Sequence, residues 1–198
     1  MMALFDSHCH VDEPKFDDDR ENVLTRMAEA GVTRYAVIGS DMATSRHSAD
    51  FAAEHPGCYA AIGIHPHEAK GFVEDDLQRL ADWSKEEKVV AIGEIGLDYY
   101  YDLSPRETQM TVCEAQMELA WELSLPVAYH IRDAHQDMLD IMKRHKKHLT
   151  GGIIHCFSGS QSFFQTVQCR RYIAVFCSND GFCFCDAVSY THLRAHET

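Results

Sequence analysis

The chain has 198 residues, which is the length of one domain or of a piece of a larger one. Its hydrophobic content of 45% is ordinary for a globular protein, and no apolar run approaches the length of a membrane helix. The net charge of −13 argues against a broad nucleic-acid-binding face, although it leaves room for a nucleic acid substrate held through metal ions.

Short apolar segments alternate with amphipathic segments along the chain, with one strand about every 30 residues. The predicted strands cover residues 1–5, 34–39, 58–64, 89–93, 126–129, 151–154 and 172–174. The predicted helices cover residues 17–30, 41–55, 75–86, 105–123 and 134–148. Asp41 and Ser104 are the expected N-caps of the second and fourth helices. This alternation predicts βα units and a parallel sheet.

Polar side chains collect where five of these strands end. They are His8, His10, His65, Glu94, His130 and His155. An open doubly wound sheet and a closed barrel both fit the alternation of elements. In a (β/α)8 barrel the chemistry gathers from the carboxyl ends of several strands around one mouth. Because no glycine-rich phosphate loop follows the first strand, we favour a TIM-like (β/α)8 barrel.

His8 and His10 are two residues apart at the end of an extended segment, so their imidazoles should face the same side. Two converging neutral imidazoles are half of a divalent metal site. The alternative is a pair of surface histidines in a turn. Glu94 directly follows an apolar strand and, if buried, needs a cation or several donors. It could bridge two metal ions, or it could form a salt bridge with Arg132.

His130 and His155 complete their strands in the same manner and are predicted metal ligands. Core histidines bonded to the backbone are the alternative. His65 is expected to contact substrate, whereas His67 is interpreted as structural.

Arg132 lies two residues beyond His130, and its planar guanidinium suits an anionic oxygen of the substrate. An ion pair with Asp133 or Glu94 is the alternative. Asp6 is expected to support the metal ligands without binding the metal itself.

These stretches resemble the TatD family of metal-dependent hydrolases in order and in spacing. The matching motifs are Asp6–His10, Gly63–His67, Gly93–Tyr99, Pro126–Asp133 and His155–Gly159. The resemblance implies a TIM-like barrel that hydrolyses phosphodiester bonds of DNA or RNA by a metal-activated water. It also implies two divalent ions, zinc, manganese or magnesium, with ligands at His8, His10, Glu94, His130 and His155. Glu94 is the bridging carboxylate in this scheme.

The end of the chain departs from the family pattern. We expect residues 1–174 to form a partial barrel of about seven strands, and residues 175–198 to be an aberrant, non-native tail. The segment Val175–Asp186 has neither helical nor strand period, and a frameshift near Ala174 is our hypothesis for it. No residue matches the family's last metal-binding aspartate, which would act as general base. Weak metal retention and little activity are therefore expected of this chain.

Four widely spaced cysteines, Cys9, Cys58, Cys113 and Cys156, are expected to be reduced thiols in a cytoplasmic protein without a membrane partner. Two alternatives to the nuclease stay open. One is an amidohydrolase acting on a cyclic amide or lactone, for which Arg132 would hardly matter. The other is a fragment that binds metal without turnover. The native metal, the choice between DNA and RNA, and the oligomeric state are left open by the sequence.

Overall fold

The computed structural model describes residues 3–160, 163, 172–174, 176–177 and 183–184. Seven parallel strands form one sheet in chain order. They are β1 (Leu4–Cys9), β2 (Val32–Ile38), β3 (Cys58–Ile62), β4 (Val89–Asp98), β5 (Val127–Arg132), β6 (Gly152–His155) and β7 (Tyr172–Ala174). The parallel sheet and the seventh strand confirm the prediction.

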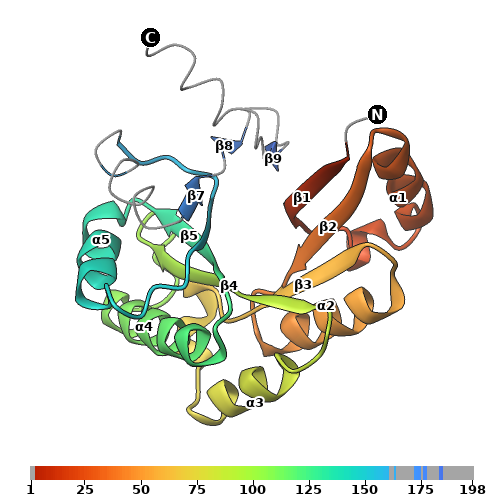
Figure 1. Cartoon of the computed structure of the whole chain (residues 1–198). Coiled ribbons are helices and arrows are strands. Elements are labelled where there is room, and N and C mark those ends of the chain that lie inside the picture. Colours follow the sequence, from red (N-terminus) through yellow and green to blue (C-terminus); the bar gives the residue numbers. More distant parts are fainter. Residues whose placement is uncertain (1–2, 161–162, 164–171, 175, 178–182, 185–198) are drawn as a thin grey trace.

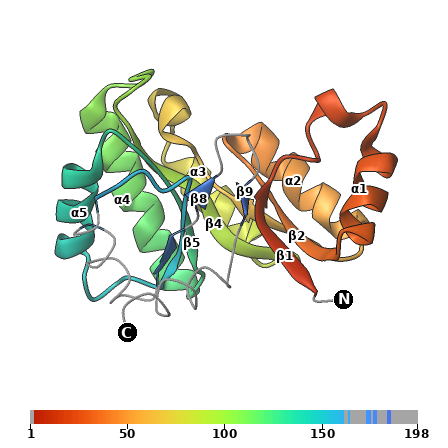
Figure 2. The same ribbon diagram turned by 90° about the horizontal axis from the view of Figure 1, so that it is seen from above.

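The helices lie on the outer side of the curved sheet (Figures 1 and 2). The α-helices are α1 (Arg20–Glu29), α2 (Met42–Glu54), α3 (Asp75–Trp83), α4 (Arg106–Leu123) and α5 (His135–Arg144). Two short 3-10 helices, η1 (Pro14–Phe16) and η2 (Pro66–Gly71), follow the first and third strands. Each helix returns the chain to the start of the next parallel strand, as the βα pattern requires.

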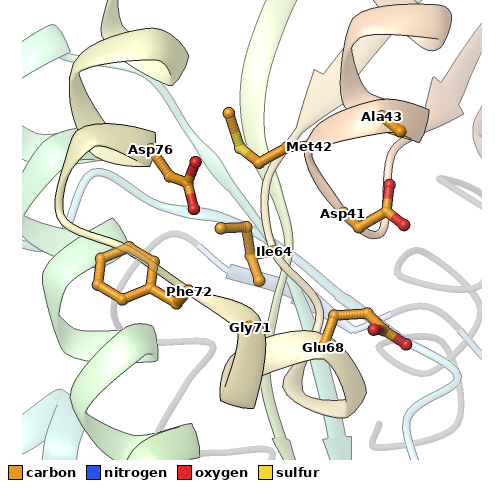
Figure 3. Close-up of a pocket in the computed structure, with 8 residues that line it drawn as sticks. All are labelled: Asp41, Met42, Ala43, Ile64, Glu68, Gly71, Phe72 and Asp76. Carbon is orange, nitrogen blue, oxygen red and sulfur yellow. The ribbon is translucent and has the colours of Figure 1, made fainter.

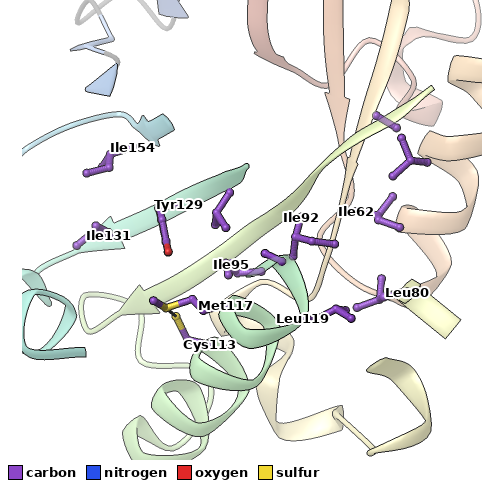
Figure 4. Close-up of a cluster of buried hydrophobic side chains, with 14 of the residues drawn as sticks. Ile62, Leu80, Ile92, Ile95, Cys113, Met117, Leu119, Tyr129, Ile131 and Ile154 are labelled. Atoms are coloured by element: carbon purple, nitrogen blue, oxygen red, sulfur yellow. Dashed lines mark hydrogen bonds between the residues drawn. The ribbon is translucent and has the colours of Figure 1, made fainter. Parts of the chain in front are cut away.

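The apolar core lies between the sheet and these helices (Figure 4). Ile92, Ile95 and Leu97 of β4 are fully buried, and they pack in one cluster with Ile62 of β3 and Leu80 of α3. Parallel strands covered on both faces are apolar throughout, which is why this part of the sequence shows no alternation.

The curved sheet is open between β1 and β7, which are its two edges. A short antiparallel pair, β8 (Phe176–Cys177) and β9 (Cys183–Phe184), is drawn between these edges in both views (Figures 1 and 2), and β9 contacts β1. The architecture is an incomplete TIM-like barrel, as predicted. The expected non-native tail and the frameshift segment lie mostly outside the described residues. In the described part of the chain, no helix is long and apolar enough to cross a membrane.

The strand ends and one cap differ from the prediction. Strands β1, β4 and β5 run on through His8, Glu94 and His130 instead of stopping before them, because these polar side chains face an internal cavity while their backbones stay in the ladder. Asp41 caps α2 as predicted, accepting the Thr44 N–H at 2.7 Å. Ser104 does not cap α4; its hydroxyl donates to the His67 carbonyl at 2.8 Å instead.

Candidate metal centre

The carboxyl ends of β1, β3, β4, β5 and β6 open into one cavity of about 640 Å³. All of the predicted site residues line it, namely His8, His10, His65, Glu94, His130, Arg132 and His155. Residues spread over most of the chain therefore meet at one mouth, as the barrel prediction requires.

A first group of potential ligands consists of His8, Glu94 and His155, whose donor atoms lie within 4.8 Å of one another. His8 Nε2 is 3.6 Å from Glu94 Oε2, and the His8 and His155 rings stack with centroids 3.5 Å apart. We refer to these three residues as the inner group.

Both ring nitrogens of His8 are buried and have no hydrogen-bond partner among the described residues. Burial lowers the pKa of His8 to about 3, so the ring is neutral and keeps a lone pair. An unpaired buried imidazole is costly, and a metal ion removes that cost. The inner group thus fits a divalent ion.

A second group, called here the outer group, consists of His65, His67 and His130. Burial lowers the pKa of His65 to about 3. Burial would also lower the pKa of His130, but the Glu94 and Asp98 carboxylates outweigh it and raise that pKa. Asp98 Oδ2 lies 2.9 Å from His67 Nε2 and 2.8 Å from His130 Nε2.

Glu94 joins the two groups. Its Oε1 is 3.3 Å from His130 Nδ1, while its Oε2 faces His8. Burial alone would raise the pKa of this carboxyl, but the His8 and His130 imidazoles outweigh it and hold the pKa well below the usual range. A carboxylate with one oxygen toward each histidine group is placed as a bridging ligand would be.

His10 lies beside the inner group and is not a member of it. Its ring centroid is 5.1 Å from that of His8, and its Nδ1 is 3.7 Å from Glu13 Oε1. The two imidazoles face the same cavity, as their spacing predicts. The His10 nitrogens do not join the group of donor atoms that contains His8, because β1 ends at Cys9 and His10 begins the turn.

Asp98 is the main residue of the cavity that the sequence reasoning missed. Asp98 is fully buried at the end of β4 and takes part in the outer group through two histidines. The signal was present: Asp98 stands four residues after Glu94, so the two share a strand face. It was lost because β4 was expected to stop at Gly93. His67, interpreted above as structural, is hydrogen-bonded to Asp98 and also belongs to a group that could hold a metal, so its role stays a prediction.

Gly96 allows β4 to place both carboxylates in the cavity. Its φ of +142° lies in the region that favours glycine, and a Cβ there would stand 2.0 Å from the His130 carbonyl oxygen. Only glycine lets β4 and β5 approach so closely between Glu94 and Asp98.

The remaining predicted residues also contact the site. Asp6 Oδ1 accepts the His8 backbone N–H at 3.1 Å, a contact that suits its expected supporting role. Within the described part of the chain, Arg132 forms neither of the alternative ion pairs considered above. Its guanidinium carbon lies 4.1 Å from the Tyr100 ring centroid and 4.8 Å from that of Tyr101.

A smaller cavity of about 270 Å³ lies between α2, η2 and α3 (Figure 3). Three carboxylates line it, from Asp41, Glu68 and Asp76. Two of them serve the local backbone: Asp41 caps α2, and Asp76 accepts the Val73 N–H at 3.1 Å. No histidine is among the described residues that line this cavity, so it lacks the imidazole ligands that the larger one offers.

Histidines and carboxylates gathered at the strand ends of a parallel barrel are the arrangement typical of metal-dependent hydrolases. The sequence model of the family described as TatD-related DNase matches residues 5–181. The chain belongs to this family, as the resemblance of its motifs predicted.

Individual relatives agree with this assignment. An uncharacterized metal-dependent hydrolase, YabD of Bacillus subtilis, is 43% identical over 157 residues, which is 79% of this chain and 62% of that protein. The 3'-5' ssDNA/RNA exonuclease TatD of Cronobacter sakazakii is 35% identical over 84% of this chain and 64% of its own length. The crystal structure of YJJV, a TatD homologue from Escherichia coli, superposes with a TM-score of 0.79 at 34% identity, over 86% of this chain and 66% of that one. The chain thus spans less than two thirds of the length of the two relatives.

Proposed function

We propose that the chain is a divalent-metal-dependent phosphodiesterase of low turnover that acts on nucleic acid, DNA or RNA. The observation that carries the proposal is His8, which lies next to Glu94 and His155 and whose two buried nitrogens have no hydrogen-bond partner among the described residues. The names of relatives support the substrate class, since one of them is a 3'-5' ssDNA/RNA exonuclease. Cys9, Cys58 and Cys113 form no disulfide among the described residues, which supports a cytoplasmic setting.

In this proposal the inner group and the outer group each hold one divalent ion, zinc, manganese or magnesium, and Glu94 serves both. His8, His130 and His155 are ligands, and His10 completes the inner group from the rim. Ions bound there supply a water of lowered pKa and neutralise charge on the phosphoryl oxygens. His-rich ligand sets lean toward zinc or manganese over magnesium.

The residues of the chain then have separate tasks. Asp6 fixes the backbone of His8, and Asp98 fixes the rings of His67 and His130. Burial keeps His8 and His65 neutral, so that neither repels a cation. Arg132 faces the same cavity and is assigned to a phosphate oxygen, while His65 contacts the substrate.

The test is nucleotide release from single-stranded DNA with Mg²⁺, Mn²⁺ or Zn²⁺, on the full chain and on a His8→Ala/His10→Ala variant. His148→Ala, which stacks on Trp121 away from the cavity, is the matched histidine control. Loss of activity in the double variant alone supports the proposal. Equal activity in all three proteins would contradict the metal site. If the full chain is folded and binds metal but releases no nucleotides, the proposed activity of this chain is contradicted.

An amidohydrolase is separated from a nuclease by Arg132→Ala. This variant should lose phosphodiester cleavage, whereas hydrolysis of a cyclic amide or lactone would hardly change.

The division of the chain at residue 174 is also a proposal. Resequencing the source DNA through Val175–Asp186 tests the frameshift hypothesis, and an intact in-frame read would defeat it.

A further inference from the structure

Two exposed tyrosines stand at the mouth of the candidate metal cavity. Tyr100 and Tyr101 lie two and three residues beyond the end of β4 and are 59% and 53% exposed. Their rings meet edge to face, with centroids 4.9 Å apart. Tyr101 lines the cavity, and its ring also lies 5.4 Å from that of His67 in the outer group. Large exposed aromatic side chains at a cavity mouth are typical of recognition sites.

A positively charged side chain, Arg132, lies next to the two tyrosines. The Arg132 guanidinium lies over both rings, and it is the one lysine or arginine among the described residues that line the cavity. We call Tyr100, Tyr101 and Arg132 the aromatic platform. On a chain with a net charge of −13, a lone guanidinium beside two aromatic rings is a specific feature and not part of a general basic surface.

The platform is fixed to the outer group by a single side chain. Asp98 Oδ1 accepts the backbone N–H groups of Tyr100 at 3.0 Å and of Tyr101 at 2.8 Å. Its other oxygen, Oδ2, holds His67 and His130. One buried carboxylate therefore sets the distance between the aromatic rings and the candidate metal ligands, so that a ligand on the rings is held in register with the cavity.

We propose that this platform is a nucleotide subsite, in which a base of a single-stranded nucleic acid stacks on Tyr101 while Arg132, supported by Tyr100, pairs with a phosphate. The inference rests on the proposed function and adds to it where the substrate is held. Aromatic rings accept any base, because every base has a π-face, whereas a base within a duplex is not free to stack. The subsite therefore selects unpaired nucleotides without reading their sequence.

The test measures binding of a fluorescein-labelled single-stranded octanucleotide by anisotropy in EDTA, where no cleavage takes place. A second octanucleotide carries abasic residues throughout and keeps the phosphates. The full chain should bind the first about 5- to 150-fold more tightly than the second, the range expected of stacking one base. Tyr101→Leu should remove this preference, and Tyr101→Phe, which keeps the ring, should retain it.

Leu103→Ala is the matched control, because Leu103 is 52% exposed in the same loop and does not line the cavity. Circular dichroism verifies that each variant is folded. Equal binding of the two octanucleotides by the full chain overturns the subsite, and so does a preference that survives in Tyr101→Leu.

Hydrolysis of bis(4-nitrophenyl) phosphate with Mn²⁺ separates this outcome from failure of the proposed function. If the full chain prefers the octanucleotide with bases but does not hydrolyse this ester, the proposed phosphodiesterase is contradicted and the subsite is supported. If the full chain hydrolyses the ester but shows no preference for bases, only the subsite is contradicted.

Discussion

The inner and outer groups line the same cavity, but they differ in how their polar atoms are satisfied. In the inner group, both nitrogens of His8 are buried without a hydrogen-bond partner in the described part of the chain, and Glu94 Oε2 lies 3.6 Å from its Nε2. In the outer group, Asp98 receives His67 and His130 at hydrogen-bond distance. The inner group therefore leaves buried polar atoms unpaired when no metal is bound. The hydrogen bonds of the outer group, in contrast, stabilise the fold even without a metal.

The largest effect is expected where the two groups meet. Glu94→Gln keeps the size of the side chain but removes the charge that faces both His8 and His130. We expect activity to fall by at least about 100-fold, because even partners behind metal ligands contribute 10- to 100-fold. The number of metal ions bound per chain, measured by inductively coupled plasma mass spectrometry, should also fall, because both groups lose a ligand.

Glu13→Gln is the control for that change, since Glu13 lines the same cavity, where its Oε1 is near His10 and its Oε2 pairs with Lys15 at 2.6 Å. It should retain most of the activity. If Glu94→Gln and Glu13→Gln behave alike, Glu94 does not join the groups.

The second prediction concerns the outer group as part of the fold. Asp98→Asn replaces a buried acceptor that serves two histidines and two backbone N–H groups. We expect a loss of about 1–3 kcal/mol in the free energy of unfolding in EDTA. Urea denaturation measures it. Asp76→Asn, at the smaller cavity, should also lower stability but leave metal binding intact. An Asp98→Asn protein as stable as the parent would show that the outer group is not structural.

Much of this architecture was readable from the sequence. The parallel sheet and the strand ends that meet at one cavity follow from apolar segments that each lead to a histidine or glutamate. What failed was the point at which β4 ends. Periodicity reports whether a segment is buried, but it does not report a buried carboxylate, and so Asp98 was read as part of a loop. The missing information is tertiary: Asp98 is stabilised by His67 of η2 and His130 of β5.

The lack of tertiary information in the sequence also explains why the positions of His10 and His67 relative to the two groups were not predicted. Spacing showed that His8 and His10 face one side, but the turn that begins after Cys9 takes His10 out of the inner group. His67 has the same spacing from His65, and there η2 keeps both rings together with centroids 4.3 Å apart. Local sequence does not distinguish these two turns, whereas packing on the neighbouring strands does.

The third prediction tests the inner group directly. His8→Phe replaces unpaired buried nitrogens by apolar atoms and keeps a ring to stack on His155. Without metal, the variant should be as stable as the parent or more stable by about 1 kcal/mol, which corresponds to about 2–4 °C in Tm. Differential scanning fluorimetry in EDTA measures it.

With saturating Zn²⁺ or Mn²⁺ the order should reverse. The parent gains stability from metal binding, about 2.7 kcal/mol when the ion is at 100 times its Kd, and the variant does not gain this from the inner group. A His8→Phe protein clearly less stable than the parent in EDTA would mean that His8 is a satisfied core histidine.

The smallest effect is expected at Ser104, which supports the outer group from behind. Its hydroxyl donates to the His67 carbonyl at 2.8 Å and accepts the Lys70 N–H at 3.1 Å. Ser104→Ala removes both contacts without touching a candidate ligand, so unfolding should become easier by about 1 kcal/mol while metal stoichiometry stays unchanged. Thr25→Ala, which removes one exposed hydroxyl contact in α1, is the control and should have a smaller effect. If Ser104→Ala also lowers metal occupancy, η2 positions His67 for binding, and the outer group depends on its fold as much as the fold depends on it.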